Sequence, residues 1–185
     1  MLRTIDVLPY DPAWPREFER IRERLLAVVG GLCIGIEHVG STSVPGLAAK
    51  PIVDIDVVIS SRLVFPAVRS ALHEAGYVHR GNLEIPGRES FLAPAHTFPH
   101  HLYVCSVETP NLHDHLILRD MLRARPALRD RYADAKRHAA RQHPHDIDAY
   151  IDGKSGVIAE IMAFARAESS FEHFQPGPAP APRSS

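Results

Sequence analysis

Residues 51–59, with the sequence PIVDIDVVI, constrain the fold of this chain more than any other segment. Valine and isoleucine dominate the run, which is too short for a typical helix and ends at two serines. Because β-branched residues lie on both sides of the acids, we expect a central strand of a sheet. Alternate residues of a strand point to the same side, so Asp54 and Asp56 are predicted to share one surface.

The segments around this strand predict an α/β (α+β) fold. A strand–helix–strand order is typical of an α/β layer, and we expect a mixed β-sheet flanked by helices, followed by a helical C-terminal third. The expected elements are a helix over 14–28, strands over 33–39 and 51–59, a helix over 63–75, extended segments at 77–78, 90–93 and 100–107, and helices over 112–123, 126–142 and 147–167.

A length of 185 residues predicts one domain, over residues 1–168, with the sheet in about 1–108 and the C-terminal helices in about 111–168. Residues 169–185 are rich in proline, which favours extended chain, and we expect a disordered tail.

Composition excludes several function classes. The formal net charge of -1 shows no bias toward nucleic acid, and no apolar run reaches the roughly 18 residues of a membrane span. Cys33 and Cys105 lie in apolar runs, so buried thiols in the cytoplasm are expected. A Walker A loop, a Gly-x-Ser-x-Gly elbow and a dinucleotide-binding glycine pattern are all missing, which argues against P-loop kinase, hydrolase and Rossmann functions.

The aspartate pair is the candidate metal site. Two carboxylates on one surface raise each other's pKa, and a divalent cation between them relieves the repulsion. Hard oxygen ligands favour Mg²⁺ or Mn²⁺, which also accept phosphate oxygens. The alternative is that Asp54 and Asp56 lie at the solvent side of a half-covered sheet or pair with a helix arginine.

A small-residue loop precedes the pair and is the candidate phosphate site. Such a loop presents backbone N–H groups and hydroxyls without bulky side chains. The four residues are an ordinary turn by themselves, but their place about a dozen residues before Asp54 suggests a phosphate cradle beside a cation. The loop consists of Gly40, Ser41, Thr42 and Ser43.

Several cations and histidines are weaker candidates. Lys50 and Arg88 are candidates to neutralise phosphate charge, against the alternatives of a solvated lysine and an ordinary strand residue. Lys136 and Lys154 each follow a tyrosine by four residues and are candidates to close over the sheet. For these two lysines, a solvated surface is the alternative. Arg119 and Arg123 are four apart on one helical face beside Asp120, an arrangement that suits either an anion clamp or surface ion pairs. The pairs at His113 and His115 and at His143 and His145 do not favour zinc, because ligands two apart diverge on a helix.

The run from Glu37 to Asp56 resembles the GrpB family of the nucleotidyltransferase superfamily. The resemblance extends over about residues 5–166 and includes the two Tyr-x-x-x-Lys motifs. It implies a polymerase-β-like palm, a nucleoside triphosphate as donor, Mg²⁺ held by carboxylates, and an acceptor of unknown identity. It names neither the base nor an oligomeric state.

One departure keeps a second function open. In the superfamily a third carboxylate usually comes from a neighbouring strand, whereas residues 100–107 carry no acid. His101 is the candidate ligand or proton acceptor in its place, and Tyr103 stands where the family has a histidine. The alternative is a non-catalytic nucleotide-binding or interaction domain. A glutamate such as Glu37 or Glu84 folding beside the pair would favour the enzyme.

Overall fold

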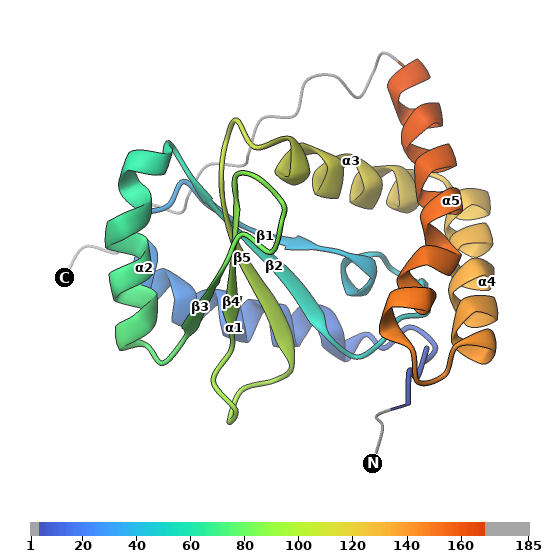
Figure 1. The fold of residues 1–185 in the computed structure, drawn as a ribbon, viewed down its shortest axis with the longest axis horizontal. Coiled ribbons are helices and arrows are strands. Elements are labelled where there is room, and N and C mark those ends of the chain that lie inside the picture. Colours follow the sequence, from blue (N-terminus) through green and yellow to red (C-terminus); the bar gives the residue numbers. More distant parts are fainter. Residues whose placement is uncertain (1–3, 169–185) are drawn as a thin grey trace.

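A five-stranded sheet in the order β1-β2-β5-β4-β3 lies in the middle of the fold (Figure 1), in a computed structural model that describes residues 4–168. β2 and β5 pair in parallel and the other neighbouring strands are antiparallel, so the predicted mixed sheet is confirmed. The strands are β1 (Gly35–Val39), β2 (Val53–Ile59), β3 (Val78–Gly81), β4 (Arg88–Leu92) and β5 (His100–Ser106).

The helices follow the predicted order. Within residues 4–168 three long helices follow the last strand, as the sequence predicts, and a short 3-10 turn, η1, follows β1 directly. The helical elements are α1 (Ala13–Val29), η1 (Ser41–Ser43), η2 (Arg62–Val64), α2 (Phe65–Glu74), α3 (Pro110–Ala124), α4 (Pro126–Gln142) and α5 (Ile147–Ala167).

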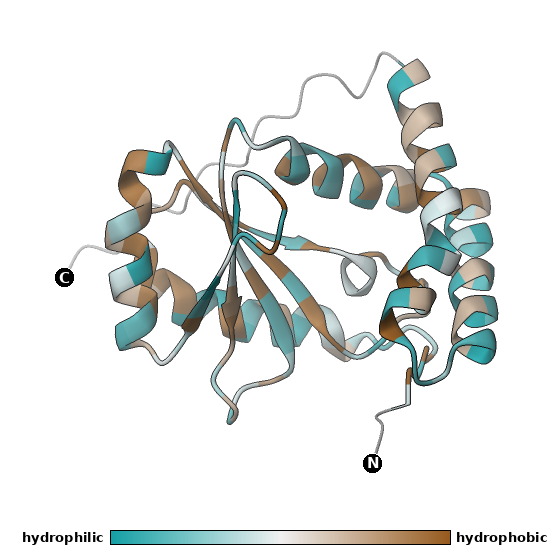
Figure 2. Ribbon diagram, viewed as in Figure 1, coloured by the Kyte–Doolittle hydropathy of each residue, from teal (hydrophilic) through white to brown (hydrophobic). Residues whose placement is uncertain are grey.

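One face of the sheet forms the main core with α1 and α2. The predicted spacing on α1 is confirmed, because Phe18, Ile21 and Leu25 are buried against the sheet. Ile55 of β2 and Leu102 of β5 lie in the same cluster, both inaccessible to solvent. Helices α1 and α2 alternate between hydrophobic and hydrophilic colours in Figure 2, as expected of helices that bury one side.

The opposite face carries the acids. Register pairs Val39 of β1 with Asp54, and Asp54 with His101 of β5. Asp56 lies between Glu37 and Tyr103 in the same way, so these side chains share the face that α1 and α2 do not cover.

The three C-terminal helices enclose part of this acidic face. Leu112 and Leu116 of α3 pack against Val58 of β2, which fixes α3 over the sheet. Helices α4 and α5 pack on α3 and on the segment that follows η1, where Leu47 is buried with Tyr132. In Figure 1, α3 lies above the sheet, and α4 and α5 lie side by side at its right.

Element boundaries differ from the predictions by a few residues. Helix α3 begins at Pro110, because proline suits a first helical turn, and β1 begins at Gly35, because the turn after Val29 continues through Cys33.

Cys33 and Cys105 are free and buried, as predicted. Within residues 4–168 no helix is long and apolar enough to cross a membrane. The predicted tail at 169–185 lies outside the described residues.

Candidate functional site

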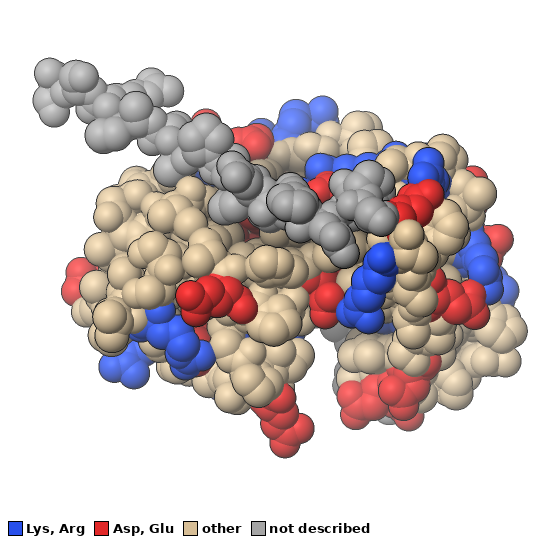
Figure 3. Space-filling view, turned by 90° about the horizontal axis from the view of Figure 1, so that it is seen from above, with Lys and Arg blue, Asp and Glu red and all other residues tan. Residues whose placement is uncertain are grey.

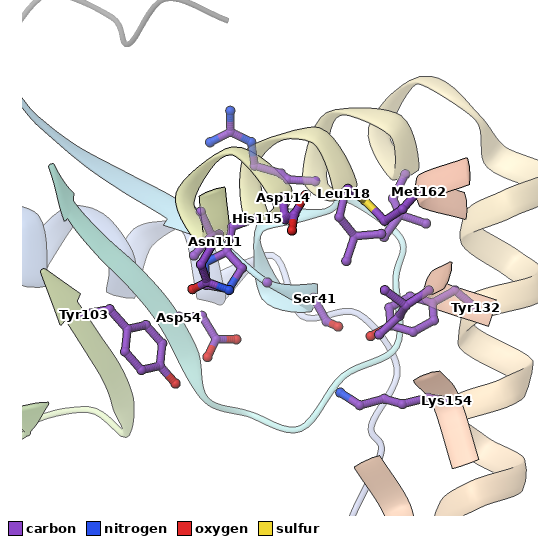
Figure 4. Close-up of a pocket in the computed structure, with 15 residues that line it drawn as sticks. Ser41, Asp54, Tyr103, Asn111, Asp114, His115, Leu118, Tyr132, Lys154 and Met162 are labelled. Carbon is purple, nitrogen blue, oxygen red and sulfur yellow. The ribbon is translucent and has the colours of Figure 1, made fainter. Parts of the chain in front are cut away.

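A cavity of about 380 Å³ lies between the acidic face of the sheet, η1 and the helices α3 and α5 (Figure 4). Residues four apart on α5 line the cavity, so one face of that helix forms part of the cavity wall. Its sheet and loop side includes Gly40, Ser41, Asp54 and Tyr103, and its helix side includes Leu118, Leu122, Lys154, Ile158 and Met162.

Asp54 and Gly40 bring the predicted carboxylate and the predicted loop together. Gly40 has φ 68° and ψ -172°, a conformation that favours glycine, and a Cβ placed there would lie 2.2 Å from Oδ2 of Asp54. Nδ1 of His101 lies 2.8 Å from Oδ1 of Asp54, so the imidazole is held against that carboxylate while half of its side chain stays exposed. The loop, the acid and the histidine therefore form one site.

Asp56 is buried beneath Asp54. Its Oδ2 lies 2.8 Å from Nδ1 of His115, and among the described residues its buried Oδ1 has no hydrogen-bond partner. Burial raises the pKa of Asp56, while the hydrogen bond and charge of His115 oppose that rise. Asn111 of the cavity wall also has a buried Oδ1 without a hydrogen-bond partner among the described residues, so two polar atoms in this region are unpaired.

Sequence reasoning did not identify His115 as a functional candidate. The His-x-His pattern by itself assigns it no role, and its contact with Asp56 joins residues far apart in the chain. A signal was present, since His115 lies one turn from Leu112 and Arg119 on the buried side of α3.

Glu37 is the glutamate that folds beside the aspartate pair. It lies opposite Asp56 in the register of β1 and β2, but its Oε2 accepts a hydrogen bond of 2.8 Å from Arg119. Arg119 also binds Asp120, so this arginine is a buried ion-pair partner. Glu84 lies in the turn between β3 and β4.

Within the loop, only part of the predicted set faces the cavity. The hydroxyl of Thr42 donates to the carbonyl of Ile52, and that of Ser43 donates to the carbonyl of Gly40, so both are used by the fold. Ser41 lines the cavity and lies 2.9 Å from Nζ of Lys136.

The C-terminal helices place cations around this loop. Arg123 donates twice to the carbonyl of Ser43, and Lys136 donates to the carbonyl of Ala48. Lys154 faces the cavity from α5, where burial lowers its pKa and Asp54 opposes that effect. Lys136 is thus buried beside the loop and Lys154 lines the cavity, so neither is a solvated surface lysine.

Lys50 and Arg88 lie outside the cavity lining. Nζ of Lys50 lies 5.3 Å from the centre of the Tyr150 ring, beside a second cavity of about 360 Å³. Arg88 lies over the ring of Tyr103 at 4.4 Å, and its positive charge opposes the rise in the pKa of Asp56. Arg88 therefore acts on the site through charge, at one remove from the cavity.

The carboxylate oxygens fit a divalent cation whose remaining ligands would include phosphate oxygens. Asp56 Oδ1 lacks a partner among the described residues, and Asp54 Oδ2 faces the Gly40 turn. Within residues 4–168 there is no cluster of three or more histidines, cysteines or acids positioned to hold a metal. Mg²⁺ is commonly held by one or two carboxylates together with water and substrate phosphates. Asp54 lines the cavity and the buried Asp56 lies behind its wall, so these two carboxylates fit that kind of site.

Surface charge gives no sign of a nucleic-acid platform on the face that Figure 3 shows. Basic and acidic side chains are interspersed there, without a continuous basic patch.

The fold is that of the polymerase-β-like nucleotidyltransferases. The solved GLD-2/RNP-8 complex matches with a TM-score of 0.59 at 14% sequence identity, over 88% of this chain and 58% of that one. At this identity the match concerns the fold alone.

The chain belongs to the GrpB family, because the model described as GrpB protein matches residues 4–163. The UPF0157 protein BH1888 of Halalkalibacterium halodurans is 38% identical over 167 residues, covering 89% of this chain and 84% of that protein. The UPF0157 protein YqkA of Bacillus subtilis is 36% identical over 156 residues, and the match spans only 46% of its length. A crystal structure of GrpB from Enterococcus faecalis matches with a TM-score of 0.80 at 32% identity, over 89% of this chain and 99% of that one.

Proposed function

We propose that this protein is an Mg²⁺-dependent nucleotidyltransferase that moves a nucleotidyl group from a nucleoside triphosphate to a small-molecule or protein acceptor. The main support for this proposal is the close approach of Gly40 and Asp54 at the cavity, which brings the small-residue loop next to the carboxylates. Mn²⁺ is the alternative cation, since its ligand preferences are similar.

Each part of the proposed site has a separate task. Asp54 and Asp56 would hold the cation, which neutralises charge on the phosphates when bound. The turn at Gly40 leaves room for phosphate oxygens, and Ser41 offers a hydroxyl to them. Lys154 supplies a positive charge from the opposite wall of the cavity.

His101 is proposed as the proton acceptor for the acceptor hydroxyl. When Nδ1 of its neutral ring donates to Asp54, Nε2 keeps a lone pair. The half-exposed ring places that nitrogen within reach of a molecule arriving from solvent. His101 would then serve where the superfamily uses a third carboxylate.

Calorimetric titration of the protein with ATP in the presence of Mg²⁺ tests this function. We expect binding by the wild-type protein and its loss in Asp54→Asn and Asp56→Asn. Asp152→Asn, which removes one exposed acid of α5, is the matched control and should bind as wild type does. Equal affinity in all four proteins contradicts the proposal.

A specific observation also supports the alternative of a non-catalytic nucleotide-binding domain. Glu37 lies beside the pair, which taken alone favours the enzyme. Its Oε2 is engaged by Arg119 at 2.8 Å, however, and it is this ion pair that supports the alternative. Release of pyrophosphate from nucleoside triphosphates, measured with a panel of acceptor alcohols and amines, separates the two. Release that depends on Asp54 favours the enzyme, and binding without release favours the alternative.

We propose a cytoplasmic location for this activity. Cys33 and Cys105 are free, buried thiols, which suits a reducing compartment.

A further inference from the structure

We propose that Ser41 and Lys136 form a serine–lysine pair, and that Ser41 is itself an acceptor of the nucleotidyl group. This inference rests on the nucleotide site proposed above and names one acceptor for it. It uses a buried amine to which the proposed transfer assigns no task.

The geometry of the pair supports this assignment. Nζ of Lys136 lies 2.9 Å from Oγ of Ser41, within hydrogen-bond distance, and the lysine side chain is only 1% exposed. Ser41 lines the cavity that also contains Asp54, so its hydroxyl faces the region where the nucleotide is expected (Figure 4). The nucleophile is accessible while its base is shielded from water.

The surroundings of Lys136 favour a neutral amine. Its charge has no carboxylate partner among the described residues. Its hydrogen bonds go to Ser41 and to the carbonyl of Ala48, and Nζ lies 4.7 Å from the centre of the Tyr132 ring. Burial, and to a smaller extent the charges of Lys154 and Arg137, lower the pKa of Lys136 to about 7 against the opposing charge of Asp54.

The neutral amine is chemically suited to activate the hydroxyl. In the structure Nζ donates to Oγ of Ser41 and to the carbonyl of Ala48. When the amine is neutral, one N–H can still donate to Ala48 while the lone pair accepts the proton of Ser41. A hydroxyl with an adjacent buried base is the usual arrangement of an activated serine.

The proposed step balances without a further reactant. The O–H bond of Ser41 breaks and its proton moves to Nζ of Lys136. Oγ forms a bond to the α-phosphorus of the nucleoside triphosphate, the bond from that phosphorus to the bridging oxygen breaks, and pyrophosphate leaves with the electron pair. The product is a nucleotidyl ester of Ser41.

Mass spectrometry of the full chain after incubation with ATP and Mg²⁺ tests the inference. We expect a mass increase of one adenylyl group, mapped to Ser41 by peptide sequencing, and its loss in Ser41→Ala. In Lys136→Met the rate should fall by about 10²-fold or more, the usual contribution of a general base. Lys136→Arg should be equally slow, because a guanidinium stays protonated.

Several outcomes overturn the proposal. ATP binding without an adduct, an adduct elsewhere, a phosphoryl in place of an adenylyl mass, or equal rates in the Lys136 variants would each do so. Calorimetry on the same samples shows whether ATP binds. Binding without an adduct means that the serine–lysine proposal fails, whereas no binding means that the proposed nucleotide site fails. If Lys136→Met does not fold by circular dichroism, the position of the wild-type adduct and the rate in Lys136→Arg decide.

Discussion

The two faces of the sheet use the same strands for opposite purposes. On the face toward α1 and α2, Ile55 and Leu102 are inaccessible to solvent and pack in a continuous apolar cluster. On the other face, Asp54 and Asp56 alternate with those residues along the same strand and meet His101 and His115. The comparison indicates that one face mainly stabilises the fold, while the other keeps polar groups that a packed core would not tolerate.

Ile55→Ala should have the largest effect on stability. Removing a buried isoleucine side chain leaves a cavity between β2 and α1, and the expected loss is about 2–5 kcal/mol in the free energy of unfolding. Urea denaturation measures it. The control is Leu63→Ala, which truncates a side chain that is 91% exposed and should change stability by less than about 0.5 kcal/mol. Similar losses of stability in both variants would contradict the stabilising role assigned to the face toward α1 and α2.

Gly40→Ala should have the next largest effect and should act on both stability and ligand binding. The backbone at φ 68° and ψ -172° favours glycine, and the new Cβ would collide with Asp54. We expect a loss of about 1–3 kcal/mol from backbone strain, together with loss of nucleotide binding by calorimetry. Gly31→Ala is the control, since a Cβ there meets nothing within 4 Å. Unchanged binding in Gly40→Ala would contradict this role of the loop.

Lys136 should make stability depend on pH. Its folded-state pKa of about 7 lies below the ordinary value of 10.5, so between these values the unfolded chain binds more protons. The free energy of unfolding contributed by this group therefore rises with pH across that window, by at most about 1.4 kcal/mol per pH unit.

Denaturation curves for wild type and Lys136→Met at several pH values test the sign. The variant should lose that part of the slope, while Lys154, whose pKa burial also lowers, contributes to both proteins. Parallel slopes in the two proteins would show that Lys136 stays charged when folded.

Asp54→Asn should have the smallest effect on stability. The carboxylate is partly exposed and the amide oxygen can still accept from His101, so the change should stay within about 1 kcal/mol. Thermal unfolding monitored by circular dichroism measures it beside the binding assay. A large destabilisation would mean that the polar face also holds the fold together.

Much of the fold could be predicted from local patterns. The nine-residue run at 51–59 specified a strand, its register of acids and its buried alternate side, because a period of two residues is a local property. The helix spacing of α4 and α5 was equally local, and their predicted bounds match the structure.

The partners of the site residues required the tertiary structure. His115 reaches Asp56, Arg119 reaches Glu37, and Lys136 reaches Ser41, each across more than fifty residues of sequence. Such contacts depend on how α3 and α4 pack over the sheet, and no spacing rule in a single sequence encodes that packing. Lys50 shows the converse. It is close to Asp54 in sequence, but it lies against Tyr150 and does not line the cavity.

A crystal structure with Mn²⁺ and a non-hydrolysable nucleoside triphosphate tests the central claim most directly. Anomalous scattering from manganese should appear at the carboxylates of Asp54 and Asp56, with the triphosphate along the turn at Gly40 and Ser41. Nucleotide or manganese bound elsewhere, with both aspartates still engaged only by their histidines, would contradict the account.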